Sequence, residues 1–292
     1  MKRAIAAACI LFLLSGIPLP TAQTPAPDYS QLDPKPFDPK TDPNIDMFIS
    51  SWREGVPHQT YGGLIERDIF THCEGDPVRP TTRGAVLEYL NRFTYALLQE
   101  HTSTTPSTLK GEQVVFYVDS GKGAIRTKGK TADLHEGVGV LIPEGLEFTL
   151  SNTGDTPLAL YVIAEPVQAG FTPAKEMVVR DENTIPVSTT QSHWSHILRV
   201  LFYRNDPLAT LIGMCPVWFA PMTMGQPHSH GPGNEEIWFV VRGEITVLLG
   251  KQLRAFSPGM AYKIPPNGTT PHSNINTGNS MVKMFWLMRT PK

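Results

Sequence analysis

The sequence predicts an all-β protein built from two barrels in tandem, and three observations lead to this prediction. Proline and glycine are both abundant, with 27 and 24 copies, which favours a chain with many turns over a helical one. Short apolar runs rich in Val, Ile, Phe and Tyr recur along most of the chain and are separated by turn residues. Special turn residues also recur at a constant spacing, which indicates an internal duplication.

The apolar runs have the length of β-strands and begin at about Met47. The strongest helix candidate is Ala85–Glu100, although this stretch also fits strands. Many short strands at close spacing favour a barrel or a sandwich. The clearest strand candidates are Gly84–Leu90, Gln113–Val118, Val138–Ile142, Leu158–Ile163, Leu198–Tyr203, Ile237–Val241, Ile245–Leu249 and Met281–Met288.

The duplication relates the two halves of the chain. When the chain is shifted so that Gly121 falls on Gly243, Pro143 also falls on Pro265, and the apolar runs around these residues superpose. Glycine and proline end strands and form turns, so matching positions indicate matching turns. Two homologous β-domains are therefore expected.

The N-terminus has the layout of a secretory signal peptide. A basic start at Lys2 and Arg3 is followed by an apolar run that ends at Leu14 and by small residues up to Ala22. The alternative, an uncleaved membrane anchor, is disfavoured because the run is shorter than the ~20 residues that span a bilayer. We expect an exported protein, secreted or periplasmic, that is free of the membrane after cleavage. The predicted organisation is a signal peptide over 1–22, a Pro/Asp-rich arm over 23–46, an N-terminal β-domain over 47–166 and a C-terminal β-domain over 167–292.

Charge and cysteine content narrow the functional classes. The net charge is −2 and no basic stripe occurs, so nucleic acid is not an expected partner. No P-loop, dinucleotide fingerprint or G-x-S-x-G is present, which leaves nucleotide binding and serine hydrolysis without support. Cys73 and Cys215 follow the signal peptide, and export would permit a disulfide between them, but two separate buried thiols fit their spacing as well.

Four side chains of the second repeat form a candidate metal site. On an extended chain His228 and His230 project to the same face. The loop 231–234 then turns the chain back, so that Glu236 can aim its carboxylate at the same point, and His272 would add a third imidazole from a neighbouring strand. Three imidazoles and one carboxylate suit one divalent transition metal, which could be Fe, Mn, Ni, Cu, Co or Zn.

The spacing of these residues resembles the two sequence motifs of the cupin superfamily. The first motif is matched by Gly225, His228, His230, Glu236 and Gly243, and the second by Gly259, Pro265, Gly268, His272 and Asn276. The chain departs from the motif on either side of the two histidines and before His272, while the distance from Glu236 to Gly243 is the usual one. That distance favours Glu236 over Glu235 as the ligand, and Glu235 stays an alternative.

The resemblance implies two double-stranded β-helix (jelly-roll) barrels in tandem, a bicupin, with the metal motif in the C-terminal cupin only. The shift that superposes the repeats places residues that ligate metals poorly at the metal positions of the first repeat, so that barrel is expected to be degenerate and apolar inside. His228, His230 and Glu236 correspond to Pro106, Thr108 and Val114, and His272 corresponds to Leu150, or to Phe148 if a shorter loop is allowed for.

The resemblance also implies a function. The first hypothesis is a metal-dependent oxidoreductase of the dioxygenase type acting on a small organic molecule, in which Glu236 stays a ligand or transfers a proton once displaced. Decarboxylases, lyases and isomerases occur in the family as well. Oxalate decarboxylase is ranked low, because in that group both barrels usually carry metal and an Arg closely precedes H-x-H, and a quercetinase-like enzyme fits better. The alternative is a non-catalytic module that binds a metal or a small ligand such as a sugar or phenolic. A homodimer is a family-based expectation.

A second histidine pair, His193 and His196, precedes the motif. Side chains three positions apart on a strand point to opposite faces, so these two are not expected to act together. Large apolar side chains near the motif are expected to fill the core or to wall a pocket. They are Trp218, Phe219, Met222, Met224, Trp238 and Phe239.

Overall fold

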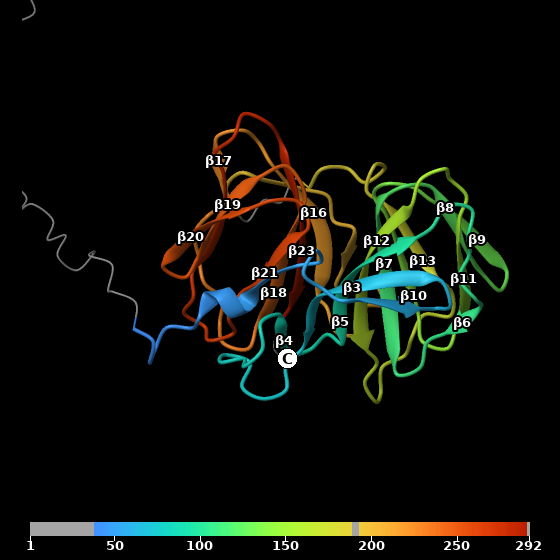
Figure 1. Cartoon of the computed structure of the whole chain (residues 1–292), viewed down its shortest axis with the longest axis horizontal. Helices are drawn as coiled ribbons and strands as arrows, with labels where there is room; N and C mark the ends of the chain where they lie inside the picture. The colour runs from blue at the N-terminus through green and yellow to red at the C-terminus, as the bar shows by residue number, and fades with distance from the viewer. Residues whose placement is uncertain (1–37, 189–192, 291–292) are drawn as a thin grey trace, which may run out of the picture. The chain divides into compact units, whose positions relative to one another are not determined.

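The computed structural model describes residues 38–188 and 193–290. The predicted signal peptide and most of the predicted arm lie outside these residues. The regular elements of the described part are β-strands and one short 3₁₀-helix, η2 (Ile45–Phe48), which confirms the all-β class (Figure 1). No helix among these residues has the length and apolarity needed to cross a membrane.

The first barrel consists of a large sheet and a smaller sheet. In the large sheet the order is β13 (Val178–Asp181), β10 (Val138–Ile142), β7 (Glu112–Ser120), β12 (Leu158–Pro166), β5 (Arg92–Leu98), β3 (Leu64–His72) and β2 (Pro57–Thr60), with β4 (Ala85–Leu87) beside β3. In the smaller sheet the order is β6 (Ser107–Thr108), β11 (Glu147–Asn152), β8 (Gly123–Thr127) and β9 (Lys130–Leu134).

The second barrel repeats this plan. Its large sheet runs β1 (Ile49–Ser51), β21 (Met260–Lys263), β18 (Glu235–Arg242), β23 (Val282–Arg289), β16 (Gly213–Phe219) and β14 (His196–Leu198), with β15 (Phe202–Tyr203) beside β16. Its smaller sheet runs β17 (Thr223–Met224), β22 (His272–Asn276), β19 (Ile245–Leu249) and β20 (Gln252–Phe256). The tandem barrels agree with the fold class that the sequence predicts.

The structure decides two local predictions. The stretch Ala85–Glu100, which fitted either a helix or strands, forms strands β4 and β5, because its aromatic and apolar residues pair with β3 and β12. The predicted strand Leu198–Tyr203 is divided into the ends of β14 and β15, each of which pairs separately with β16.

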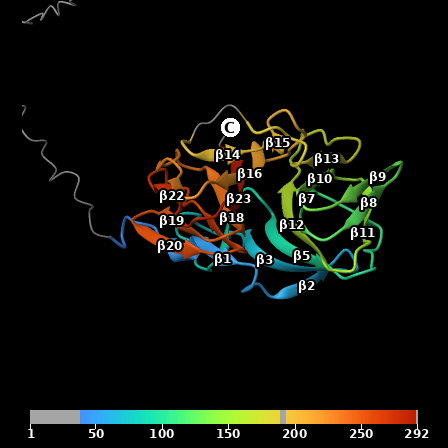
Figure 2. The same cartoon turned by 90° about the horizontal axis from the view of Figure 1, so that it is seen from above.

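Each half of the chain lends one short strand to the barrel of the other half. Strand β1 lies beside the strands of the second barrel (Figure 2). It pairs with β21, so that Ile49 lies opposite Tyr262. Strand β13 pairs with β10 of the first barrel in the same antiparallel manner, and Val179 lies opposite Val140. The predicted ranges 47–166 and 167–292 therefore exchange one strand.

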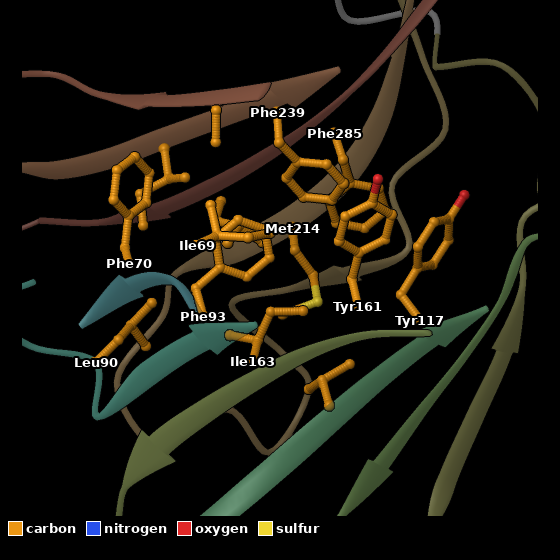
Figure 3. Packing of buried hydrophobic residues seen from close by; sticks show 14 of the residues in the cluster. Ile69, Phe70, Leu90, Phe93, Tyr117, Tyr161, Ile163, Met214, Phe239 and Phe285 are labelled. Atoms are coloured by element: carbon orange, nitrogen blue, oxygen red, sulfur yellow. The ribbon is translucent and has the colours of Figure 1, made fainter. Parts of the chain in front are cut away.

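The outer faces of the two large sheets pack together through aromatic side chains. The rings of Tyr161 and Phe239 lie 4.2 Å apart between centroids, and those of Tyr117 and Phe285 lie 4.4 Å apart (Figure 3). Strand β18 alternates accordingly: Phe239 joins this shared cluster, while its neighbour Trp238 points into the second barrel. The contact joins both barrels in one core.

Buried carboxylates also link the barrels. Glu235 accepts hydrogen bonds from the backbone N–H groups of residues 88–90 of the first half, at 2.6 Å from Glu88 N and 3.2 Å from Leu90 N. Glu165 of β12 accepts from the backbone of residues 209–211 of the second half, at 2.7 Å from Leu211 N. Each half thus caps a loop of the other.

A repeated asparagine network confirms the duplication. Asn276 donates through Nδ2 to the carbonyls of Phe219 and Ser280 and accepts from Gly278 N. Asn152 does the same in the first barrel, donating to Leu98 and Thr156 and accepting from Gly154 N. The last residue of the second motif therefore holds the turn after its strand.

Candidate metal centre

The backbone fixes how the three histidines of the motif meet. His272 begins β22, and it forms an isolated antiparallel bridge with His228, with N···O distances of 3.2 and 2.9 Å. His228 and His230 belong to an extended segment between β17 and β18, and their side chains are more buried than that of Ser229 between them. The alternation expected of an extended chain therefore places both imidazoles inside the barrel.

The four predicted side chains lie together. One ring nitrogen from each of His228, His230 and His272 lies within 4.8 Å of the other two. Among residues 38–188 and 193–290, these three histidines are the group close enough together to hold a metal ion. Glu236 contacts His230 Nε2 through Oε2, and its Oε1 lies 3.5 Å from His272 Nε2. Three imidazoles and one carboxylate thus converge inside the second barrel.

Two tryptophans hold the Glu236 carboxylate in place. The indole N–H of Trp238 donates to Oε1 at 2.6 Å, and that of Trp286 donates to the same oxygen at 3.0 Å. Burial of Glu236 acts to raise its pKa, but the nearby imidazoles of His272 and His230 outweigh it and hold the pKa well below its usual value. The carboxylate is therefore ionised and oriented.

Glu235, the alternative ligand, points away from this cluster. Its carboxylate lies on the opposite face of β18, 3.7 Å from the buried Lys263 ammonium, and accepts the backbone N–H groups of residues 88–90. Consecutive residues of a strand face opposite sides, so only one of the two carboxylates can enter the barrel. The structure places Glu236 there.

The chemistry of the donor atoms fits a metal ion. The Nε2 atoms of all three histidines and Oε2 of Glu236 are buried without a hydrogen-bond partner of acceptable geometry. Such groups are costly unless something satisfies them. His228 Nδ1 lies 2.8 Å from the Gln226 carbonyl, which leaves Nε2 with the free lone pair, as is usual for metal-binding histidines. Burial lowers the pKa of His228, which favours the neutral ring that a metal requires.

A cavity of about 470 Å³ opens beside the cluster. This volume falls within the ~300–1,000 Å³ common for small-molecule sites. Most of its wall is apolar or aromatic, and the buried free thiol of Cys215 is part of it. Cys73 is also a free buried thiol, so the two cysteines do not form a disulfide in this structure. The wall consists of Ser188, His193, His196, Leu198, Val200, Tyr203, Cys215, Val217, His230, Glu236, Trp238, Trp286 and Met288.

His193 and His196 line this cavity together, contrary to the expectation that they would point apart. Strand β14 begins only at His196, and a turn precedes it in which His196 N donates to the His193 carbonyl at 3.1 Å. The ring of His193 stacks on that of His228, with centroids 4.4 Å apart. The assumption of a strand through both residues was the error, because a turn brings side chains three apart to one side.

Gly225 makes room for His196. A Cβ atom on Gly225 would lie 2.5 Å from His196 Nε2, which is closer than any real contact. The Gly225 N–H and carbonyl are both held by β22, through Asn274 O at 2.8 Å and Ser273 Oγ at 2.7 Å. The first glycine of the motif therefore has a packing role next to the site.

The first barrel has other side chains at the equivalent positions. In the second barrel His272 lies opposite His228. In the first barrel Phe148, the counterpart of His272, lies opposite Ser107 where β11 pairs with β6. Ser107, and not Pro106, is therefore the counterpart of His228. Aligning the repeats by one constant shift placed the counterpart of His228 one residue too early, because the loops of the two repeats differ in length. Phe148 and Val114 are both fully buried in the apolar core of that barrel.

Comparisons with known proteins agree with the two barrels. A family model described as "Cupin domain" matches residues 95–164 and again residues 217–288. No curated protein matches the sequence. Among solved structures, Ylba from E. coli superposes with a TM-score of 0.64 at 13% identity, covering 85% of this chain and 93% of that one.

Two further structures show the same likeness. AerE from Microcystis aeruginosa superposes with a TM-score of 0.63 at 10% identity, and the superposition covers 84% of this chain and 100% of the AerE chain. Oxalate decarboxylase from Bacillus subtilis, a protein with Mn(II) centres, superposes with a TM-score of 0.63 at 13% identity. The superposition covers 87% of this chain and 80% of the decarboxylase chain. At these identities the likeness establishes the fold alone.

Proposed function

Because this chain is a two-domain protein of the cupin superfamily, we propose that its second barrel binds one divalent transition metal through His228, His230, Glu236 and His272. We further propose that the protein is a metal-dependent oxidoreductase of the dioxygenase type that acts on a small organic molecule. The observation that carries the proposal is the convergence of three imidazoles and one carboxylate, in which Nε2 of His228 and of His272 lacks a hydrogen-bond partner, beside a cavity that His230 and Glu236 line.

The chain's own residues would bind and orient the substrate. A metal held by these four groups would supply Lewis-acid and redox chemistry toward substrate and dioxygen. The apolar wall formed by Leu198, Val217 and Met288 would favour a substrate without charge on the part that contacts it. Glu236 would accept or return a proton at Oε2, since Oε1 is engaged by two indole N–H groups.

The cavity wall argues against a small dianionic substrate such as oxalate. Among the described residues that line it there is no lysine or arginine, while Glu236 carries a negative charge close to the cavity. Recognition of a dicarboxylate usually depends on cationic side chains. The metal remains to be chosen among Fe, Mn, Ni, Cu, Co and Zn, and manganese is the first to test because a structurally similar protein contains it.

One observation favours a second candidate, a non-catalytic module that binds a metal or a small ligand such as a sugar or phenolic. The Glu236 carboxylate is gripped by two indoles and by His230, which suits a fixed ligand better than a mobile proton carrier. The two candidates make different predictions about turnover.

The deciding experiment is oxygen uptake by protein of measured metal content, with a panel of phenols, flavonols and organic acids. Uptake that requires the metal and is lost in His228→Ala supports the enzyme. Metal binding and ligand binding without turnover across the panel support the module. Protein that binds none of the six metals overturns the enzyme, and protein that binds neither a metal nor a ligand of the panel overturns both candidates.

We also propose that the protein is exported, on the strength of the signal-peptide layout of residues 1–22. N-terminal sequencing of protein recovered from the medium or periplasm tests this, since export predicts a mature chain that begins near Ala22. A full-length N-terminus on membrane-bound protein would favour the anchor instead.

A further inference from the structure

We propose that His193 is a substrate-binding residue and that its imidazole selects neutral aromatic molecules carrying a hydroxyl group. This inference rests on the proposed function, because it assigns a substrate class to the same cavity. His193 lies outside both sequence motifs, and it reaches the cavity through the turn that precedes β14.

His193 is close to the metal cluster without belonging to it. Its ring lies over that of His228 at an interplanar angle of 14°, yet its nitrogens do not join the group whose atoms lie within 4.8 Å of one another. A ligand bound in the cavity would therefore meet His193 beside the metal ligands. This is the position in which a second polar contact can fix the orientation of a substrate.

An unsatisfied atom on His193 indicates what that contact would be. Its Nδ1 is buried and has no hydrogen-bond partner. A neutral imidazole offers one N–H donor and one acceptor, and a hydroxyl group can complement either of them. Since Nδ1 already lacks a partner in the free protein, a ligand hydroxyl that meets this atom gains a hydrogen bond that an apolar ligand cannot make.

His196 has a different role, which makes it a useful comparison. It is only 5% exposed, and its ring packs edge-on against Phe219 and Trp238, with centroids 4.9 and 5.5 Å away. Its Nε2 faces the backbone at Gly225 so closely that no side chain fits there. His196 therefore supports the cavity wall, and His193, which is half-buried, is the imidazole that a ligand can reach.

The rest of the wall defines the remainder of the ligand. Trp238, Trp286 and Tyr203 supply aromatic surface, and the described lining contains no lysine or arginine to hold a carboxylate or phosphate. Aromatic rings stack and pack well against such walls. Hydroxyl-bearing neutral aromatics, of which phenol is the simplest probe, combine both requirements.

The test measures binding without turnover. Zinc-loaded full-length protein, which cannot cycle redox states, is titrated with phenol and with toluene, and quenching of tryptophan fluorescence gives each Kd. We expect the wild type to prefer phenol, and we expect His193→Phe to weaken phenol binding about tenfold, the effect of one lost hydrogen bond, while toluene binding stays the same or tightens. Phenylalanine keeps the ring that stacks on His228. In His193→Asn, whose amide can donate and accept, part of the phenol preference should return.

Three results would overturn the inference. One is an equal loss of phenol and toluene binding in His193→Phe, which would indicate a packing role. Another is a wild type without preference for phenol. The third is a lower zinc content in His193→Phe, which would make His193 a metal ligand. Failure of the wild type to bind any metal would instead overturn the proposed function, and the phenol and toluene titrations of metal-free protein would still test His193.

Discussion

Glu235 and Glu236 are consecutive residues of β18, yet their carboxylates serve different parts of the molecule. Glu235 faces the first barrel, where it caps the backbone of residues 88–90 and approaches the buried ammonium of Lys263. Glu236 faces the interior of its own barrel and meets His230 and two indoles. Substitutions at these neighbours should therefore separate stability from metal binding.

Glu235→Ala should lower the free energy of unfolding by about 3–5 kcal/mol, the usual cost of leaving a buried charge without its partner. The buried Lys263 ammonium would lose the carboxylate that lies 3.7 Å away, and the N–H groups of residues 88–90 would lose their acceptor. Urea denaturation measures the change. Glu235→Gln, which keeps an acceptor oxygen, should lose less, and metal content per folded molecule should stay that of the wild type. A loss below about 1 kcal/mol in Glu235→Ala would show that solvent replaces the carboxylate.

Glu236→Gln should weaken metal binding at least tenfold while changing stability less than Glu235→Ala does. The amide oxygen can still accept from Trp238 and Trp286, but the charge that attracts the cation is gone. Metal titration with competing chelator gives the affinity, and Glu235→Gln is the matched control on the same strand. Equal affinity in both variants would remove Glu236 from the ligand set.

His272→Ala should lower metal content and leave the fold largely intact. His272 is the first residue of β22, and its pairing with His228 is made by backbone atoms that alanine retains. Elemental analysis measures the metal, and circular dichroism checks the fold. His101→Ala, which alters an exposed histidine of the first barrel, should keep the wild-type metal content. Wild-type metal content in His272→Ala would show that this assignment is wrong.

Gly225→Ala should destabilise the protein by about 1–3 kcal/mol, because the new methyl group overlaps His196 Nε2 and overpacked sites carry costs of this size. The same change in a His196→Ala background should cost less, since the clashing ring is gone. Thermal unfolding of the wild type, both single variants and the double variant gives the coupling between the sites. Strictly additive losses would mean that the two residues do not meet.

The Glu165→Gln variant should differ from the wild type in a pH-dependent manner. Burial raises the pKa of Glu165 above its usual 4.5, and its hydrogen bonds offset this only in part. Below pH 4.5 the carboxyl is protonated in both folded and unfolded chains, so ionisation carries no penalty; the penalty grows as pH rises through the folded pKa. The stability of the wild type relative to the variant should thus improve as pH falls from neutral toward 4.5, by urea denaturation at each pH. An opposite trend would mean that the folded pKa is depressed.

That the four predicted side chains of the second barrel lie together could be predicted from the sequence, because the information is local. Alternation of side chains places His228 and His230 on one face, and the same rule separates Glu235 from Glu236 once the inner face of β18 is known. The repeat also indicates where the strands turn, and the networks of Asn152 and Asn276 show why.

Other parts of the site depend on long-range pairing that no local pattern reveals. Trp286 reaches Glu236 only because β23 lies beside β18, and nothing in its own segment indicates that neighbour. His193 was missed because the alternation rule was applied across a turn. Gly225 is a signal that the sequence offers for His196, since a glycine beside a strand can mark the close approach of another side chain.

The exchange of β1 and β13 has consequences for how the chain can be divided and how it arose. A single cut between the repeats would leave β1 on a fragment without its partner β21 and would remove β13 from β10. Separately expressed halves should therefore be soluble mainly as a reassembled pair. A single-repeat ancestor could complete both sheets as a symmetric dimer in which each copy donates its first strand. After fusion of two such copies the repeats could diverge, and Phe148 now fills the first barrel at the position that His272 has in the second.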